Sequence, residues 1–170
     1  MFSWLGMRAQ VQQFVQQCAT CQQAKTEHSR TPGLLQPHVI PPEAWRMVSM
    51  DFIEGMPHSG KFDIILVVID KLTKYGHFIL VKHPFTAATI AQLFVDNVYK
   101  LHSMPKVLIS DRDKVFTSSF WQNLFRIADT TLNLSSSYHP QTDGQTECLN
   151  QCLETYLRCL VHANPTHWTN

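Results

Sequence analysis

The stretch Phe62-Asp63-Ile64-Ile65-Leu66-Val67-Val68-Ile69-Asp70 decides the fold class of this chain. A continuous run of β-branched and aliphatic residues is typical of a strand that is buried on both faces of a sheet. The run is far too short to cross a bilayer, which needs about 20 apolar residues in a helix. The rest of the chain is therefore expected to cover both faces of a central sheet.

Two shorter strand-like runs flank this stretch. Residues 47–53 precede it and residues 77–82 follow it. Gly60 and residues 71–76 supply turns between the runs. Because the connections are short, the three runs are predicted to form an antiparallel meander.

Helical and strand patterns alternate after the meander. The order βββαβαβα predicts an α/β domain with a mixed sheet and helices on its faces. The expected elements are a helix capped by Thr86 that runs to about Leu101, a strand over 107–109, a helix from a Ser119–Gln122 capping box to about Ala128, a strand over 132–134 and a long helix ending near Val161. On the first helix, residues 90, 93, 94, 98 and 101 are expected to face the core, and on the last helix residues 149, 153, 156 and 160.

The N-terminal segment has a different character. Residues 7–25 show helical apolar spacing, and residues 26–44 form a polar, proline-rich stretch that is typical of an extended linker. We therefore expect a helical module over 1–25, a linker over 26–44, a core domain over 45–164 and a tail over 165–170.

The overall charge indicates no particular partner. The 170 residues contain 14 Lys+Arg and 13 Asp+Glu, a formal net charge of +1. This balance excludes a strongly basic nucleic-acid coat, but a local basic groove for nucleic acid stays possible. No signal peptide or membrane span is recognisable, so a reduced, intracellular protein that is not secreted is expected.

Three acidic residues occur at the ends of different predicted elements. Asp51 lies in an apolar strand, where a carboxylate either points outward or is bound by a partner. Asp111 ends a strand, which suits a ligand site or a simple turn, and Asp113 competes with it. Glu147 lies in the first turns of the last helix, where a solvated acid is the alternative interpretation.

Carboxylates from several elements can surround one point and bind Mg²⁺ or Mn²⁺. Two such ions stabilise the attacking and leaving oxygens of an in-line phosphoryl displacement. The sequence contains no Walker-type glycine loop, G-x-S-x-G elbow or H-E-x-x-H motif. Metal-assisted phosphodiester chemistry is therefore the favoured catalytic hypothesis.

Three segments carry a resemblance to a known family. The segments 49–53 (SMDFI), 109–116 (ISDRDKVF) and 138–147 (YHPQTDGQTE) closely resemble the integrase of gypsy-type (Metaviridae) LTR-retrotransposon pol polyproteins in a plant-like version. Between Asp111 and Glu147 lie 35 residues, as in the D,D-35-E signature of the retroviral integrase superfamily. The resemblance covers essentially the whole chain.

This resemblance implies an RNase H-like fold and a DDE-type strand-transferase and endonuclease. In such enzymes the metals activate water to trim the 3′ end of element DNA and then activate the 3′-OH for strand transfer. Asp51 would bridge two Mg²⁺ or Mn²⁺ ions, and Asp111 and Glu147 would each hold one. The implied partners are element and target DNA and further copies of the chain, without a membrane. The implied place of action is the nucleus, after cytoplasmic particles.

Several residues are candidates for DNA contact. The loop 135–144 would flank the carboxylates, and Gly144 would permit a hinge. Tyr138 and Gln145 lie in or beside this loop, Asn150 lies about one helical turn from Glu147, and Lys114 follows Asp111. For Asn150, a solvated helix residue is an equally good interpretation.

The five cysteines fall into two groups. Cys18 and Cys21 have C-x-x-C zinc spacing, but the His pair that precedes such cysteines in similar integrases is absent before His28. The resemblance therefore implies that residues 1–25 are a truncated integrase zinc-binding module with an incomplete half-site. We expect Zn²⁺ to be either not bound or bound weakly with ligands from a neighbour. Cys148, Cys152 and Cys159 are expected to be core thiols of the last helix.

Two alternatives to an integrase enzyme stay open. The chain could be a catalytically silent, truncated remnant that at most binds nucleic acid, although the intact triad argues against long decay. An RNase H-type nuclease would share the fold and would cleave RNA–DNA hybrids.

Overall fold

The computed structural model describes residues 3–24, 41–134 and 144–169, and the side chains of the last helix from Leu149 onward. Its strands are β1 (Met47–Ile53), β2 (Ile64–Asp70), β3 (Gly76–Val81), β4 (Val107–Ser110) and β5 (Thr131–Leu134). Its helices are α1 (Met7–Gln17), α2 (Ala19–Ala24), α3 (Ala87–Phe94), the π-helical turn η1 (Val95–Tyr99), α4 (Lys100–His102), α5 (Ser119–Ile127) and α6 (Gly144–Leu160).

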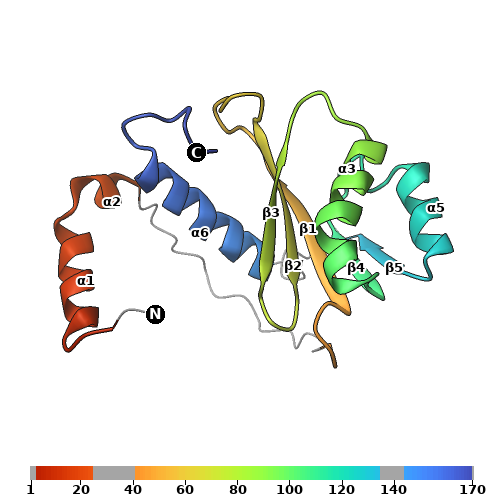
Figure 1. Ribbon diagram of the computed structural model, residues 1–170, viewed down its shortest axis with the longest axis horizontal. Coiled ribbons are helices and arrows are strands. Elements are labelled where there is room, and N and C mark those ends of the chain that lie inside the picture. The colour runs from red at the N-terminus through yellow and green to blue at the C-terminus, as the bar shows by residue number, and fades with distance from the viewer. Residues whose placement is uncertain (1–2, 25–40, 135–143, 170) are drawn as a thin grey trace.

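The five strands form one mixed sheet in the order β3-β2-β1-β4-β5 (Figure 1). Strand β2 pairs antiparallel with both β1 and β3, which confirms the predicted meander. Strand β4 pairs parallel with β1, and β5 pairs parallel with β4. The expected mixed α/β sheet is therefore confirmed, and β1 is its central strand.

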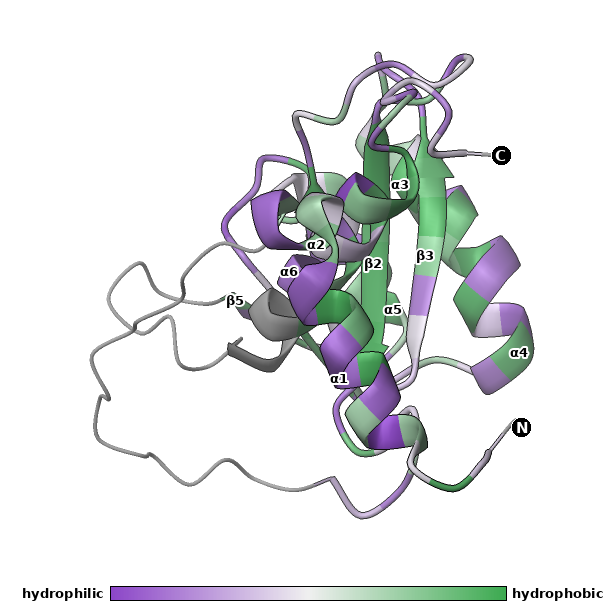
Figure 2. Ribbon diagram, turned by 90° about the vertical axis from the view of Figure 1, so that its left-hand side faces the viewer, coloured by the Kyte–Doolittle hydropathy of each residue, from purple (hydrophilic) through white to green (hydrophobic). Residues whose placement is uncertain are grey.

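Alternation along β2 divides the core into two layers. Ile64, Leu66 and Val68 point to one face and pack with α3 and α5. The intervening residues, Ile65, Val67 and Ile69, point to the other face and pack with α6. Figure 2 shows β2 as hydrophobic along its length between helices with hydrophilic outer surfaces. The prediction that this strand is buried on both faces is confirmed.

The helix that follows the meander is capped as expected but does not continue regularly. The side-chain oxygen of Thr86 accepts a hydrogen bond from the backbone N–H of Thr89 at 3.2 Å. After α3, the π-helical turn η1 changes the angular positions of the residues that follow. Leu101, which was expected to face the core, is consequently 66% exposed.

The start of α5 differs from the prediction by one residue. The N-cap is Ser118, whose hydroxyl oxygen accepts from the backbone N–H of Trp121. Gln122 donates to the carbonyl of Thr117 and does not complete a capping box. The predicted Ser119 cap is therefore wrong, because Ser119 is already the first residue of the helix.

The buried side of α6 is also rotated from the predicted one. Leu149, Leu153, Leu157 and Val161 pack on the sheet. Tyr156 and Leu160, which were expected on this side, are 60% and 59% exposed. Cys152 is exposed as well, so its prediction as a core thiol is wrong, whereas Cys159 is partly buried. The physical reason is that Leu157 lies at nearly the same angle around the helix axis as the buried Asn150. It packs against Ile65, Val67 and Ile69 of β2, and the buried side of the helix is centred on these two residues.

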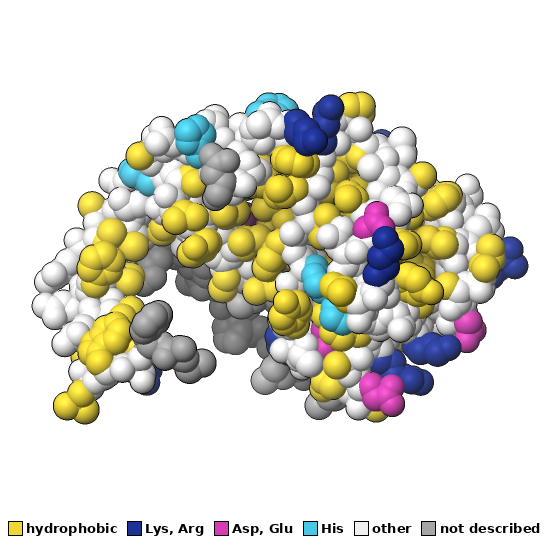
Figure 3. All heavy atoms as spheres, in the orientation of Figure 1, with side chains coloured by type: hydrophobic (Ala, Val, Ile, Leu, Met, Phe, Trp, Pro, Cys, Tyr) yellow, Lys and Arg dark blue, Asp and Glu magenta, His cyan; other side chains and the backbone are white. Residues whose placement is uncertain are grey.

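The N-terminal segment contains two helices where one was expected. Cys18 has an extended backbone (φ −80°, ψ 112°) and separates α1 from α2. No residue of α1 is buried, and Phe14 is 69% exposed. Figure 1 shows α1 projecting from the sheet domain, and the space-filling view in Figure 3 shows a hollow between them. The apolar spacing of α1 therefore predicts a helix correctly, although the described chain offers this helix little to pack against.

The described C-terminal residues return to the sheet domain. Trp168 is buried, and its indole Nε1 donates to the carbonyl of Pro57. The hydroxyls of Thr169 and Ser59 are 2.7 Å apart. This contact fixes the segment that follows β1. Within the described ranges, no helix combines the length and the hydropathy that a membrane span requires.

Candidate active site

Asp51 lies on the face of the sheet that α6 covers. Along β1, Val48 and Met50 face the α3 side, so Asp51 faces the opposite side. Its Oδ2 accepts a hydrogen bond from Asn150 Nδ2 of α6 at 2.7 Å, and its Oδ1 accepts from the Phe52 N–H at 2.9 Å. The carboxylate is partly buried. The alternative of an outward-pointing, solvated Asp51 is therefore not what the structure shows.

Asp111 follows β4 at the neighbouring strand end. Ser49 is opposite Ile109 in the parallel pair of β1 and β4, so the next residues on the same face are Asp51 and Asp111. Adjacent strands lie about 4.8 Å apart, which brings the two residues close together. Asp111 is exposed, and its Oδ1 accepts from the Asp113 N–H at 3.0 Å. Asp111 therefore forms a turn, as the simpler interpretation proposed, and also lies beside Asp51.

Asp113 points into its own loop. Its Oδ1 accepts a hydrogen bond from the Val115 N–H at 2.7 Å, and its carbonyl accepts from Thr117. Its side chain therefore organises the loop between β4 and α5. This geometry favours Asp111 over Asp113 as the partner of Asp51.

Glu147 belongs to the first half of α6, and its side chain lies outside the described residues. It precedes Asn150 by three residues, which is about one helical turn. Since Asn150 contacts Asp51, this part of α6 lies above the strand end that carries Asp51. The fold therefore brings the backbone of Glu147 to the region of the two aspartates.

Asn150 has a role that the sequence did not indicate. It is 8% exposed, and its Oδ1 is buried without a hydrogen-bond partner among the described residues. In the structure, Asn150 contacts the carboxylate of Asp51. The DNA contact that the sequence analysis expected of Asn150 stays a prediction. The spacing of three residues from Glu147 was the available signal, because it places both residues near one side of the helix.

The other predicted DNA contacts are mostly beyond the described side chains. Tyr138 and residues 135–143 lie outside the described residues, as does the side chain of Gln145. Lys114 is exposed on the loop after Asp111. Of the further cations near Asp111 in sequence, Lys100 pairs with Asp96 and Lys106 pairs with Asp129.

The donor set at the strand ends suits a hard divalent cation. Asp51 and Asp111 present carboxylate oxygens, which Mg²⁺ and Mn²⁺ prefer, and Asn150 adds a buried amide oxygen without a partner. No group of three His, Cys, Asp or Glu side chains is arranged for a metal within the described ranges, which leave out the Glu147 side chain. The residues present fit the predicted metal, and Glu147 would supply the third carboxylate.

Cys18 and Cys21 lie at the start of α2, apart from the carboxylates. A hydrogen bond with the Cys18 thiol, together with burial and the nearby Cys159, raises the pKa of the Cys21 thiol to about 11. The backbone N–H of Cys21 lowers the pKa of Cys18. The two thiols thus occupy adjacent positions, as the C-x-x-C spacing predicts.

Comparisons with known proteins found related sequences and related folds. A family model described as the integrase zinc binding domain matches residues 1–27. The Transposon Tf2-3 and Tf2-4 polyproteins of Schizosaccharomyces pombe are each 37% identical over 171 residues, which is 99% of this chain. The chain spans 13% of the length of these curated relatives.

Solved structures share the fold. The intasome of simian T-cell lymphotropic virus in complex with the PP2A regulatory subunit B56 gamma matches with a TM-score of 0.62 and 15% identity over 92% of this chain and 54% of that chain. The HTLV-2 integrase catalytic core domain in complex with magnesium matches with a TM-score of 0.55 and 15% identity over 72% and 76%. The catalytic core domain of BIV integrase matches with a TM-score of 0.53 and 21% identity over 71% and 73%.

Proposed function

We propose that this chain, which belongs to the integrases of LTR retrotransposons, provides the catalytic core for metal-dependent 3′-end processing and strand transfer of DNA. The observation that carries the proposal is the position of Asp51 and Asp111 at neighbouring strand ends, with α6 held against Asp51 through Asn150. This arrangement supports the proposal because it sets two aspartates beside each other and holds the helix that carries Glu147 against one of them, and phosphoryl transfer with two metal ions uses acids from several elements.

In the proposed site, Asp51, Asp111 and Glu147 hold Mg²⁺ or Mn²⁺ through their carboxylate oxygens. When bound, two such ions would supply activation of the attacking oxygen and stabilisation of the leaving oxygen. Asp51 has the central position, since it lies on β1 between β2 and β4. Asn150 fixes the orientation of the Asp51 carboxylate by its hydrogen bond to Oδ2.

DNA is the proposed substrate, and further copies of the chain are proposed partners. The exposed Lys114 lies three residues after Asp111 on the β4–α5 loop, where a cation can contact a phosphate next to the reacting one. Tyr138 and Gln145 remain proposed DNA contacts of the segment before and at the start of α6. With chromosomal DNA as target, the proposed place of action is the nucleus.

The test is a strand-transfer and disintegration assay on oligonucleotides with Mn²⁺. The unchanged chain is expected to give joined products, and Asp51→Asn and Asp111→Asn are expected to reduce them to background. Asp113→Asn is the matched control, because this neighbouring acid only organises its loop. Equal activity in Asp51→Asn would overturn the proposed mechanism.

The same assay separates the two alternatives. A catalytically silent remnant would at most bind nucleic acid and would give no product with any metal. An RNase H-type nuclease would cleave RNA–DNA hybrids in an Asp51-dependent manner and would not join DNA strands. The position of α6 against Asp51 favours an assembled site over a silent remnant.

A further inference from the structure

Two histidines from different elements meet on the side of the sheet that α3 covers. The Nε2 atoms of His77 on β3 and His102 on α4 are 2.9 Å apart. Ile79 and Val81 of β3 pack towards α3, so His77 faces the same side of the sheet. Both imidazole rings are partly buried. Imidazole nitrogens are the commonest metal ligands in proteins, so their convergence here marks a candidate metal site.

The backbone around this histidine pair is irregular. Trp45, Lys74 and Ser103 have φ values of 62°, 65° and 66°, and they are three of the four non-glycine residues with positive φ in the described part of the chain. The π-helical turn η1 precedes His102 and turns it towards β3, which leaves Leu101 exposed. Strained backbone conformations cluster at ligand-binding sites, so their position around the pair indicates a role beyond packing.

Neighbouring aromatic rings hold both imidazoles in place. The ring of Trp45 lies almost parallel to that of His102, with ring centroids 3.6 Å apart and an angle of 4° between the planes. The ring of Tyr75 meets that of His77 edge-on, with centroids 5.4 Å apart. The two imidazoles are therefore already ordered, which lowers the entropic cost of binding an ion between them.

The charge state of the pair also suits a cation. Burial lowers the pKa of His77, and a positive charge on His102 lowers it further. Burial likewise lowers the pKa of His102, an effect that the Asp70 carboxylate partly opposes. Both imidazoles are therefore neutral near pH 7, which is the form that binds metals. The oxygens of Asp70 accept hydrogen bonds from Trp45 and Thr73, so Asp70 acts on the pair through its negative charge.

The pair is accessible from solvent. Both histidines line an open pocket of about 690 Å³ together with Trp45, Tyr75 and Leu101. In a tetrahedral site with bonds of about 2.0–2.1 Å, two ligand nitrogens lie about 3.3 Å apart, so the rings need to separate by roughly 0.4 Å. Within the described ranges, no group of three His, Cys, Asp or Glu side chains is arranged for a metal, so water would complete the coordination.

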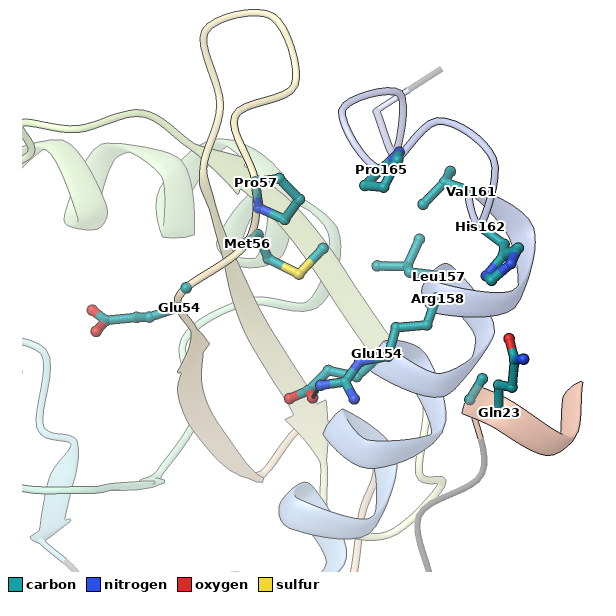
Figure 4. A pocket seen from close by; sticks show the side chains of 12 residues that line it. Gln23, Glu54, Met56, Pro57, Glu154, Leu157, Arg158, Val161, His162 and Pro165 are labelled. Atoms are coloured by element: carbon teal, nitrogen blue, oxygen red, sulfur yellow. Dashed lines mark hydrogen bonds and ion pairs between the residues drawn. The ribbon is translucent and has the colours of Figure 1, made fainter. Parts of the chain in front are cut away.

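The pocket between α2 and α6 is built differently (Figure 4). It has a volume of about 410 Å³ and is lined by His162 and by Glu154 and Arg158, which pair with each other at 3.2 Å. Because this ion pair satisfies its charges internally, the pocket offers a single imidazole to an ion. The convergent nitrogens of the histidine pair therefore make the stronger candidate.

We propose that His77 and His102 form a binding site for a divalent transition-metal ion such as Zn²⁺, which joins β3 to α4. The ion would bind both Nε2 atoms, and the imidazole that donates in the metal-free pair would carry its hydrogen on Nδ1 instead. Imidazole suits Zn²⁺, Cu²⁺ and Ni²⁺, whereas Mg²⁺ prefers carboxylates. The site lies on the opposite face of the sheet from Asp51, so it is separate from the proposed catalytic site.

The test is a Zn²⁺ titration of the folded, reduced 170-residue chain, followed by side-chain ¹⁵N NMR of its histidines. Excess Mg²⁺ is present so that Zn²⁺ does not enter the proposed carboxylate site. The Nε2 signals of His77 and His102 are expected to shift together along one saturation curve. Mg²⁺ alone is expected to leave both signals in place. Zn²⁺ that shifts neither signal, or only one of them, would overturn the proposal.

Two variants and a control locate the site. His77→Gln and His102→Gln each remove one ligand and are expected to weaken Zn²⁺ binding at the remaining imidazole by at least about tenfold. His83→Gln is the matched control, because His83 pairs with Asp63 elsewhere in the structure, and it is expected to keep the full affinity. Equal Zn²⁺ affinity in His77→Gln and the unchanged chain would also contradict the proposal.

A melting experiment gives a second measurement. Melting in EDTA shows whether each variant is folded without metal, and an unfolded variant leaves the decision to the NMR signals of the unchanged chain. Zn²⁺ is expected to raise the melting temperature of the unchanged chain more than that of His77→Gln, because an ion that binds the folded state stabilises it. None of these measurements involves DNA joining, so their failure is distinguishable from failure of the proposed catalytic function.

Discussion

The amide Nδ2 of Asn150 donates a hydrogen bond to Oδ2 of Asp51 at 2.7 Å, across 99 positions of sequence. The bond joins the central strand of the sheet to the helix that carries Glu147. A carboxylate that is held by an amide N–H has a defined direction for its remaining lone pairs. Asn150 is therefore a positioning residue for Asp51 in the proposed metal site.

The first prediction concerns this bond. Asn150→Ala removes the donor to Asp51, and we expect strand transfer to fall by about 10- to 100-fold, as for other partners of metal-binding carboxylates. A purely structural role would lower activity equally at all metal concentrations. A positioning role also raises the Mn²⁺ concentration needed for half-maximal activity. The measurement is a Mn²⁺ titration of initial rates.

Asn123→Ala is the control for this prediction, because Asn123 is an exposed asparagine on α5. Its rates and Mn²⁺ dependence are expected to equal those of the unchanged chain. An unchanged Mn²⁺ requirement in Asn150→Ala would show that the hydrogen bond does not position the carboxylate.

The strand pattern was predictable because it depends on local apolarity. The seven residues of β2 are all buried, so both sets of alternating side chains are apolar. A strand buried on both faces was therefore predictable without knowing which face each side chain occupies. The same apolar criterion failed on α6, since its buried side includes the polar Asn150. It placed Tyr156 on the core side, whereas Leu157 packs there. A polar residue within a buried helix face is recognisable only once its partner, Asp51, is known.

The acids of the proposed site were identifiable in the sequence, whereas their surroundings were not. Asp51 and Asp111 were identified from strand ends and motif spacing, and the parallel register brings them together. The exposure of Leu101 depends on the π-helical turn before it, for which the sequence shows no local signal.

The second prediction concerns Asp70, which is buried at the end of β2. Burial raises the pKa of this carboxyl, but hydrogen bonds from Thr73 and from the backbone of Trp45 outweigh burial and lower the pKa overall. Asp70→Asn weakens these bonds to a charged acceptor. We expect the free energy of unfolding at pH 7 to fall by about 2–3 kcal/mol, measured by urea denaturation.

The pH dependence of this effect has a defined sign. Because the folded-state pKa of Asp70 is lowered, its ionised form stabilises the fold above the unfolded-state pKa of about 3.9. This contribution is lost as the pH falls through the folded-state pKa, so the two proteins become more alike in acid. Asp129→Asn, at a highly exposed position, is the control and is expected to change stability by less than about 0.5 kcal/mol. The prediction would be contradicted if the difference in unfolding free energy between the unchanged chain and Asp70→Asn became larger in acid.

The third prediction concerns the histidine pair beside the start of β1. The Nε2 atoms of His77 and His102 are 2.9 Å apart, and the ring of Trp45 stacks on His102 at 3.6 Å. Burial lowers the pKa of both histidines, while Asp70 partly opposes this effect at His102. The unfolded chain therefore takes up protons before the folded chain does. Stability is expected to decrease as the pH falls below about 6.5, the unfolded-state value.

His77→Gln keeps a polar side chain but cannot titrate. Between pH 8 and pH 5.5, we expect its melting temperature to decrease less than that of the unchanged chain. Over this pH range, the unchanged chain is expected to lose more unfolding free energy than His77→Gln, by on the order of 1 kcal/mol. His167→Gln, at an exposed position, is the control and is expected to keep the full decrease. The same slope in His77→Gln and the unchanged chain would exclude the pair as its source.

The last prediction concerns the tail. Trp168 is 6% exposed, packs beside Ile53 and Leu157, and donates through Nε1 to the carbonyl of Pro57. Trp168→Ala creates a cavity and leaves that carbonyl without its donor, so we expect a loss of about 3–5 kcal/mol of unfolding free energy. Trp4→Ala removes a tryptophan that is 53% exposed and is expected to cost far less.

Amide hydrogen exchange in Trp168→Ala shows which part of the chain loses stability. Since Pro57 and Ser59 follow β1, release of Trp168 is expected to speed amide hydrogen exchange in residues 56–59 more than in α3. This segment begins three residues after the strand end beside Asp51. Faster exchange here with a folded α3 would mean that the tail orders the chain next to the carboxylates. Uniform acceleration would instead mean that Trp168 stabilises the whole domain without a local effect on this segment.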